Sequence, residues 1–232
     1  MKAANTEVRL SNRISKTEAL VLVLIFTMLL IGFILVFTNL AVFEKYIGED
    51  ALVEWITVLG LLAGAFTCFK RAITLRKHRT WLFIFTSVLL GLVLFFGAGE
   101  EISWGQRIFG IESPDYFKEK NLQGETNLHN LVLGGVKINM WVFSFLLTAV
   151  LGIYLLVIPF LYRKKKWMQN FVRYWGIPLP KTYQIIAFVF LFVTEFIPHG
   201  KRAELLEAGT ALMLFLIIRF PANTQSFEEK EN

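Results

Sequence analysis

Residues that build common catalytic and metal centres are scarce in this chain. Its 232 residues include one cysteine and three histidines. The single cysteine, Cys68, excludes an intrachain disulfide, and its place in an apolar run argues against redox or thiolate-metal chemistry. No H-E-x-x-H motif occurs, and no nucleophile elbow surrounds Ser103. Any site must therefore be inferred from how polar residues gather along the chain.

Charge is also scarce, at 18% of residues, whereas 55% are hydrophobic and the mean hydropathy is +0.55. Such a composition is too apolar for an ordinary soluble domain and predicts an all-α polytopic membrane helix bundle. The first apolar run follows a charged leader, spans a full bilayer and lacks a small-residue cleavage site. We therefore expect it to be a membrane helix and not a cleaved signal peptide.

Six segments are candidates to cross the membrane, because a crossing helix needs about 20 residues. The predicted spans are 19–43, 51–69, 81–99, 138–162, 182–198 and 203–220. The last two are the weakest, because their uncharged stretches are the shortest. This division makes residues 1–18 a leader, residues 19–220 a single transmembrane domain and residues 221–232 a tail.

Basic residues collect on one side of these spans. The leader, the loops at 70–80 and 163–181 and the tail side carry 17 of the 24 lysines and arginines, whereas the other side carries 13 of the 18 acids. The positive-inside rule places the basic side, with both termini, in the cytoplasm of a bacterial inner membrane. The pI of 9.4 is thus explained by topology, and nucleic acid is not an expected partner.

A polar connector, at about residues 100–137, joins the third and fourth spans on the outer side. "ESPDYF" predicts a short helix with Ser113 as N-cap and Pro114 at the first helical position. "ETNLHNLVLGG" predicts a second short helix that ends at Gly134-Gly135.

Carboxylates are expected deep in the outer half of the membrane. The sixth span has only 11 uncharged residues, Ala208 to Ile218, which cover roughly 16 Å. Glu204 and Glu207 must then lie near or within the membrane, and their spacing puts them on one helix face. Three other spans bring acids to a similar depth: Glu54, Glu100 with Glu101, and Glu195. Because buried charge is costly, such residues face the bundle interior and indicate a site.

The stretch "GEEISWGQRIFG" at 99–110 lies at the centre of this hypothesis. On a continuing helix, Glu100, Ser103, Trp104 and Arg107 would share a face. One interpretation is an interfacial helix end, with Trp104 as anchor and Arg107 paired to a glutamate. The other is an intramembrane site, which the matching acids on the other spans favour.

Two chemistries fit such a site. A divalent metal such as zinc suits imidazole and carboxylate ligands, whereas crowded carboxylates without metal would hold protons and serve acid–base chemistry. The predicted acid–base residues are Glu100, Glu101, His129 and Glu204. The predicted substrate-binding residues are Arg107, Trp104, Gln106 and Asn127. The predicted metal ligands are His129, His199, Glu100 and Glu207.

"GEEISWGQRIFG" followed by "NLQGETNLHNL" resembles the signature of an uncharacterised family of bacterial multi-spanning membrane proteins. The resemblance covers mainly residues 97–131 and implies no activity. Paired glutamates before an arginine also resemble the CAAX-type intramembrane endopeptidases. In this chain, however, five residues separate Glu101 from Arg107, where that family's motif has three.

These observations lead to a hypothesis of an enzyme, hydrolase-like and metal-dependent or acid–base, that acts on a lipid or lipid-linked substrate. Arg107 would hold an anionic head group, since a guanidinium binds phosphate with two parallel hydrogen bonds. Two alternatives stay open: a transporter or proton- or cation-binding protein, and a structural or assembly subunit of a membrane complex. The sequence indicates neither the substrate nor the oligomeric state.

Overall fold

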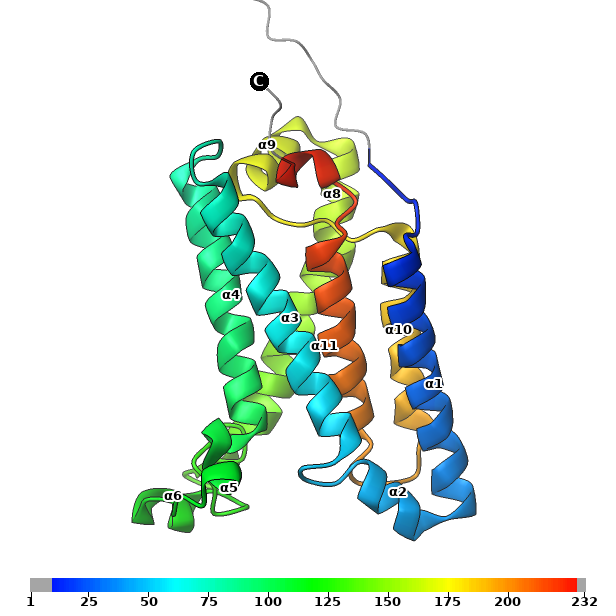
Figure 1. The fold of residues 1–232 in the computed structure, drawn as a ribbon, viewed down its shortest axis with the longest axis vertical. Coiled ribbons are helices and arrows are strands. Elements are labelled where there is room, and N and C mark those ends of the chain that lie inside the picture. Colours follow the sequence, from blue (N-terminus) through cyan, green and yellow to red (C-terminus); the bar gives the residue numbers. More distant parts are fainter. Residues whose placement is uncertain (1–9, 229–232) are drawn as a thin grey trace, which may run out of the picture.

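The computed structural model describes residues 10–228 and shows a bundle of long, near-parallel helices (Figure 1). The predicted leader and tail lie partly outside this range, at residues 1–9 and 229–232. The described part is mostly helical, in agreement with the all-α prediction.

Helices account for nearly all elements. The long ones are α1 (Lys16–Thr38), α3 (Leu52–Leu75), α4 (Trp81–Glu101) and α11 (Ala203–Arg219). One continuous helical stretch comprises η2 (Asn139–Leu146), α7 (Leu147–Gly152), η3 (Ile153–Val157) and α8 (Ile158–Lys164). The rest are α2 (Leu40–Tyr46), η1 (Ser103–Gly105), α5 (Gln106–Phe109), α6 (Asp115–Lys120), α9 (Lys166–Trp175), α10 (Thr182–Phe190), η4 (Leu191–Phe196) and η5 (Thr224–Phe227).

Within residues 10–228, four helices are long and apolar enough to cross a membrane, which supports a membrane protein. They are Lys16–Thr38, Leu52–Leu75, Trp81–Glu101 and Leu147–Lys164. Thr182–Phe196 is a shorter apolar stretch. In Figure 1, α10 lies beside α1, and α11 lies beside α3. Six crossings remain a prediction.

Helix α1, which corresponds to the first predicted span at 19–43, ends before the apolar run does. Helix α1 ends at Thr38, five residues before Phe43, and Asn39 caps it. The backbone N–H of Asn39 donates to the carbonyl of Leu35, and its side chain accepts a hydrogen bond from the N–H of Val42 at 3.1 Å. One asparagine thus ends α1 and caps α2, because its short polar side chain competes with the helix backbone.

Small residues let α3 pack closely against two neighbours. A side chain added at Gly60 would meet the backbone of Ala211 at 3.2 Å, and one at Gly64 would meet Leu94 at 3.0 Å. The apolar core of buried residues extends from α1 through α10 to α11, with Met213, Leu216 and Ile217 fully buried. The beginning of α11 and the end of α4 lie toward the same end of the bundle (Figure 1).

The helix of α4 does not continue through the motif. Ser103 and Trp104 adopt positive φ angles of 46° and 56°, and Gly105 follows at 75°. The expected shared helix face of Glu100, Ser103, Trp104 and Arg107 is therefore wrong. The chain reverses in a left-handed turn before α5, a conformation that non-glycine residues adopt only when surrounding contacts enforce it.

The two predicted helices of the connector have different outcomes. The first forms as α6, which begins one residue later than predicted, with Pro114 at the N-cap position. The second is wrong: residues 125–131 form turns, and β1 (Val132–Leu133) pairs antiparallel with β2 (Val136–Lys137). Gly134 and Gly135 have φ angles of 57° and 80°, which suit a tight two-residue hairpin turn.

Candidate functional site

The polar side chains of "GEEISWGQR" separate into two groups that face different partners. Glu100, Ser103, Gln106 and Arg107 bind residues 125–128, later in the connector, whereas Glu101 faces α11. The predicted single site is thus divided into a hydrogen-bonded polar network and a cluster of carboxylates.

Glu100 anchors the turn at residues 127–130. Its Oε2 accepts hydrogen bonds from the backbone N–H groups of Leu128 at 2.6 Å and His129 at 3.1 Å. Its Oε1 accepts from the indole N–H of Trp104 at 2.8 Å, and only 4% of Glu100 is exposed. Because both oxygens are bonded, a buried carboxylate at this position fixes the turn and the Trp104 ring.

Arg107 is bound by three carboxylates. Its Nε lies 3.1 Å from Asp50, its Nη1 lies 2.8 Å from Glu125, and its Nη2 bonds Glu54. Burial disfavours the charge of Arg107, yet the hydrogen bonds to Glu125 and the charges of Glu54 and Asp50 raise its pKa above the ordinary range. All of its nitrogens bind carboxylates, so Arg107 joins the start of α3 to the connector and does not present a free guanidinium.

A buried hydrogen-bond chain continues from Arg107 into the connector. Ser103 donates to Glu125 and accepts from the Asn127 amide at 2.8 Å, and the Asn121 amide donates to Asn127 at 2.9 Å. These four polar residues are less than a tenth exposed. Buried polar groups that are all bonded fix one conformation, which explains why Ser103 tolerates its positive φ.

Gln106 makes a second link between the motif and the connector. Its amide donates to Ser113 at 2.7 Å, and its carbonyl oxygen accepts from the N–H of Thr126 at 2.7 Å. The structure therefore brings the predicted substrate-binding residues Trp104, Gln106, Arg107 and Asn127 into one network. Their side chains bind Glu100, Ser113, Glu125 and Ser103, respectively.

His129 lies in the connector beside this network. Burial lowers its pKa below 6.5, although the nearby Glu100 carboxylate acts in the opposite direction. A lowered histidine pKa stabilises the fold above the unfolded value and loses that contribution as the pH falls.

We therefore expect hydrogen exchange at residues 125–131 to accelerate as the pH falls from about 7.5 to about 5, after correction for the intrinsic pH dependence. His129→Gln should weaken this response, whereas His78→Gln, in the exposed loop after α3, should preserve it. An unchanged response in His129→Gln would assign it to other groups.

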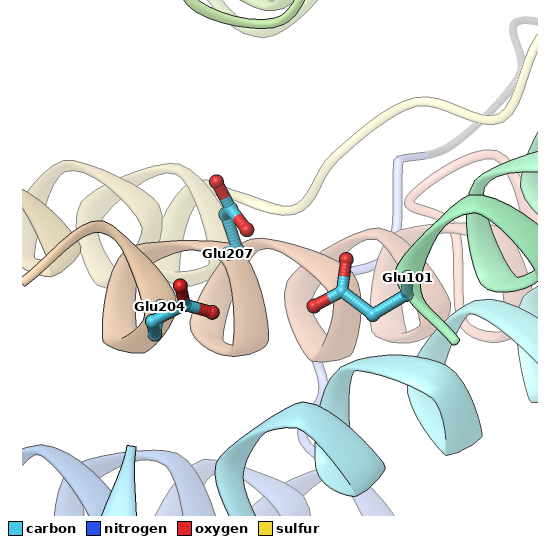
Figure 2. A group of neighbouring side chains, drawn as sticks. All are labelled: Glu101, Glu204 and Glu207. Carbon is cyan, nitrogen blue, oxygen red and sulfur yellow. The ribbon is translucent and has the colours of Figure 1, made fainter. Parts of the chain in front are cut away.

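The second group is a cluster of three glutamates, shown in Figure 2. Glu101 at the end of α4 and Glu204 and Glu207 on α11 each offer a carboxylate oxygen, and these oxygens lie within 4.8 Å of one another. All three side chains are half-buried. Within residues 10–228, no lysine or arginine lies within ion-pair distance of them, although the charges of Arg107 and Lys201 act on Glu101 and Glu204 from farther away. We call these three residues the carboxylate cluster.

The predicted metal ligands do not assemble as expected. Among the described residues, neither His129 nor His199 nor Glu100 joins a group of three potential ligands, and only Glu207 does so. The Nε2 of His199 instead lies 3.7 Å from Glu44, with its ring against Phe43. The reason is local: the helix ends at Phe196, and the following bend at 197–202 carries His199 toward α2.

Two features were missed from the sequence. The first is that Glu100 and its neighbour Glu101 face opposite partners, for which the sequence offers no signal. The second is a buried ion pair, Glu18–Lys181, with 2.7 Å between Oε1 and Nζ. Both residues flank apolar runs on the predicted cytoplasmic side, so opposite charges at equal depth were a usable signal.

Comparisons of the chain with protein-family models, with curated proteins and with solved structures found no match. The resemblance to a family of multi-spanning membrane proteins therefore stays a prediction. The functional argument depends on the two groups of polar residues alone.

Proposed function

We propose that this protein is a six-span inner-membrane protein whose carboxylate cluster binds a divalent cation at the outer side, and that this centre hydrolyses a lipid or lipid-linked substrate. The observation that carries the proposal is the convergence of Glu101, Glu204 and Glu207, whose carboxylate oxygens lie within 4.8 Å of one another. Both termini would be cytoplasmic, as the distribution of basic residues predicts.

Electrostatics favours a cation in this cluster. Three carboxylates within a few ångströms repel one another, and the cost rises as water is excluded. A bound divalent cation removes that cost. An oxygen-only ligand set suits Mg²⁺, Mn²⁺ or Ca²⁺ better than zinc, which commonly takes nitrogen or sulfur ligands. We therefore expect one of these three ions, and not zinc, to bind the carboxylate cluster.

The position of the cluster supports a lipid substrate. Glu204 and Glu207 lie in the first two turns of α11, and Glu101 is the last residue of α4, so all three are near one end of the bundle (Figure 1). If α11 crosses the membrane, this end is at the outer surface, where lipid head groups gather. A cation there would polarise a phosphoryl or acyl oxygen for attack by water.

Metal analysis of the purified protein tests the proposal. We expect the wild type to retain about one equivalent of divalent cation after dialysis, and Glu207→Gln to lower its affinity at least tenfold, because one of three anionic ligands is lost. Glu195→Gln is the matched control, since Glu195 pairs with Arg202 at 2.9 Å outside the cluster. Equal loss in both variants, or no bound cation in the wild type, would contradict the cation site.

A lipid comparison tests the reaction separately. Cells producing Glu101→Gln should accumulate a lipid or lipid-linked species that cells producing the wild type or Glu195→Gln do not. An unchanged lipid composition together with intact cation binding would reject the enzyme and retain the cation site.

A non-enzymatic role is the second candidate. No cysteine or histidine joins the group of three glutamates among the described residues, which favours a group that stores protons or a cation over one that attacks a substrate. In that case, Glu207→Gln would change proton or cation uptake into vesicles and leave lipid composition unchanged.

A further inference from the structure

A basic cavity of about 400 Å³ lies at the end of the bundle opposite to the carboxylate cluster. It is lined where α1 begins, where α3 and α11 end and along the segment after α11 (Figure 1). Its charged lining residues are Arg13, Arg71, Lys181, Arg219, Glu18 and Glu228. The cavity thus carries four cations and two carboxylates, on the side predicted to face the cytoplasm.

Three of the four cations lack a carboxylate partner. Lys181 is committed to Glu18 and to the carbonyl oxygen of Arg13. Within residues 10–228, Arg13, Arg71 and Arg219 form no ion pair. The cavity therefore keeps a positive charge that its own residues do not neutralise, which favours an anionic ligand.

The guanidinium of Arg71 is held in place at the cavity. Its Nη2 donates to the carbonyl oxygen of Arg219 at 3.2 Å, and its Cζ lies over the ring of Phe227, 4.1 Å from the centroid. A stacked guanidinium still has N–H groups for an anion, and it loses little conformational entropy when it binds one.

We propose that this cavity binds the phosphate of an anionic phospholipid from the leaflet that it faces. Arginines recognise phosphate through paired hydrogen bonds, and basic pockets between membrane helices on the cytoplasmic side suit lipid head groups. The surroundings favour a lipid over a soluble phosphate. Ile14 lines the cavity and is 54% exposed, and Leu20, farther along α1, is 69% exposed. Acyl chains can therefore extend along α1 from the cavity.

Native mass spectrometry of the full-length protein in neutral detergent tests this proposal. We expect phosphatidylglycerol to bind more tightly than phosphatidylcholine. Each basic residue at an anionic surface contributes about 1 kcal/mol, so Arg219→Gln should weaken phosphatidylglycerol binding about fivefold, and Arg13→Gln with Arg219→Gln about 30-fold. Arg76→Gln is the matched control, because Arg76 is exposed on the same side and does not line the cavity.

Three other results would contradict the proposal that the cavity binds an anionic phospholipid. Equal binding of the two lipids removes the preference for an anion, and equal loss in Arg76→Gln removes the cavity. Inorganic phosphate that binds as tightly as phosphatidylglycerol identifies a soluble phosphate as the ligand. Arg13 lies before the first helix, so Arg13→Gln alone provides a variant that keeps the helix packing if Arg219→Gln fails to fold. The carboxylate cluster takes no part in this test.

Discussion

Replacing Arg107 with alanine is expected to cost about 3–5 kcal/mol of stability, because it leaves two buried carboxylates without a countercharge. Glu54 and Glu125 are 7% and 8% exposed, and both bond the Arg107 guanidinium. For a chain of this length, such a loss lowers the melting temperature by roughly 10 °C. Thermal unfolding of the purified protein in detergent measures it.

The position of Arg107 also predicts where the damage occurs. Hydrogen exchange should accelerate first at residues 121–131, since Arg107 holds Glu125 and through it Ser103 and Asn127. Arg202→Ala is the control: its partner Glu195 and Arg202 itself are about half exposed, so its loss should cost less than about 1 kcal/mol. Similar destabilisation by both substitutions would show that the buried position of Arg107 has no special weight.

Helix positions followed from the sequence because they depend on long apolar runs. The third predicted span begins at Trp81, as α4 does, and the last begins at Ala203, as α11 does. Apolar length is a local property, so it can be read without knowing the fold. The kink after Glu101 could not be read this way, because Ser103 and Trp104 take positive φ angles where Ser103 bonds Glu125 and Asn127, which are distant in the sequence.

The sequence predicted which residues gather near the end of α4, but not that they separate into a hydrogen-bonded network and the carboxylate cluster. Counting uncharged residues indicated that Glu204 and Glu207 reach the depth of Glu101, and the structure places these three together. Whether Glu100 or Glu101 faces α11 depends on how α4 is rotated about its own axis relative to α3 and α11. That rotation is set by packing across the bundle, for example at Gly60 and Gly64, and not by the local sequence.

The network around Arg107 changes how the motif is interpreted. Residue types that suggest catalysis, namely glutamate, serine, glutamine and arginine, here satisfy one another and the turns of the connector. The connector contributes few buried apolar side chains, so polar bonds supply its rigidity. A rigid connector would in turn fix the end of α4, and with it the position of Glu101 in the carboxylate cluster.

The second large effect is expected at the opposite end of the bundle. Lys181→Met should destabilise the protein by about 3–5 kcal/mol, because it strands the Glu18 carboxylate, which is 1% exposed. Tyr183 and the Ser15 N–H also donate to Glu18, yet neither carries a positive charge. Thermal unfolding in detergent measures the loss, and Lys166→Met, at an exposed lysine, should leave stability unchanged.

A double variant separates the cost of a stranded charge from the value of the pair itself. Glu18→Gln with Lys181→Met removes both charges and keeps similar volumes, so it should recover most of the stability that Lys181→Met loses. Such recovery means that the pair fixes how the starts of α1 and α10 dock and adds little net stability. If the double variant is instead as unstable as the sum of the single variants, the two residues act independently, and the 2.7 Å contact does not couple the two helices.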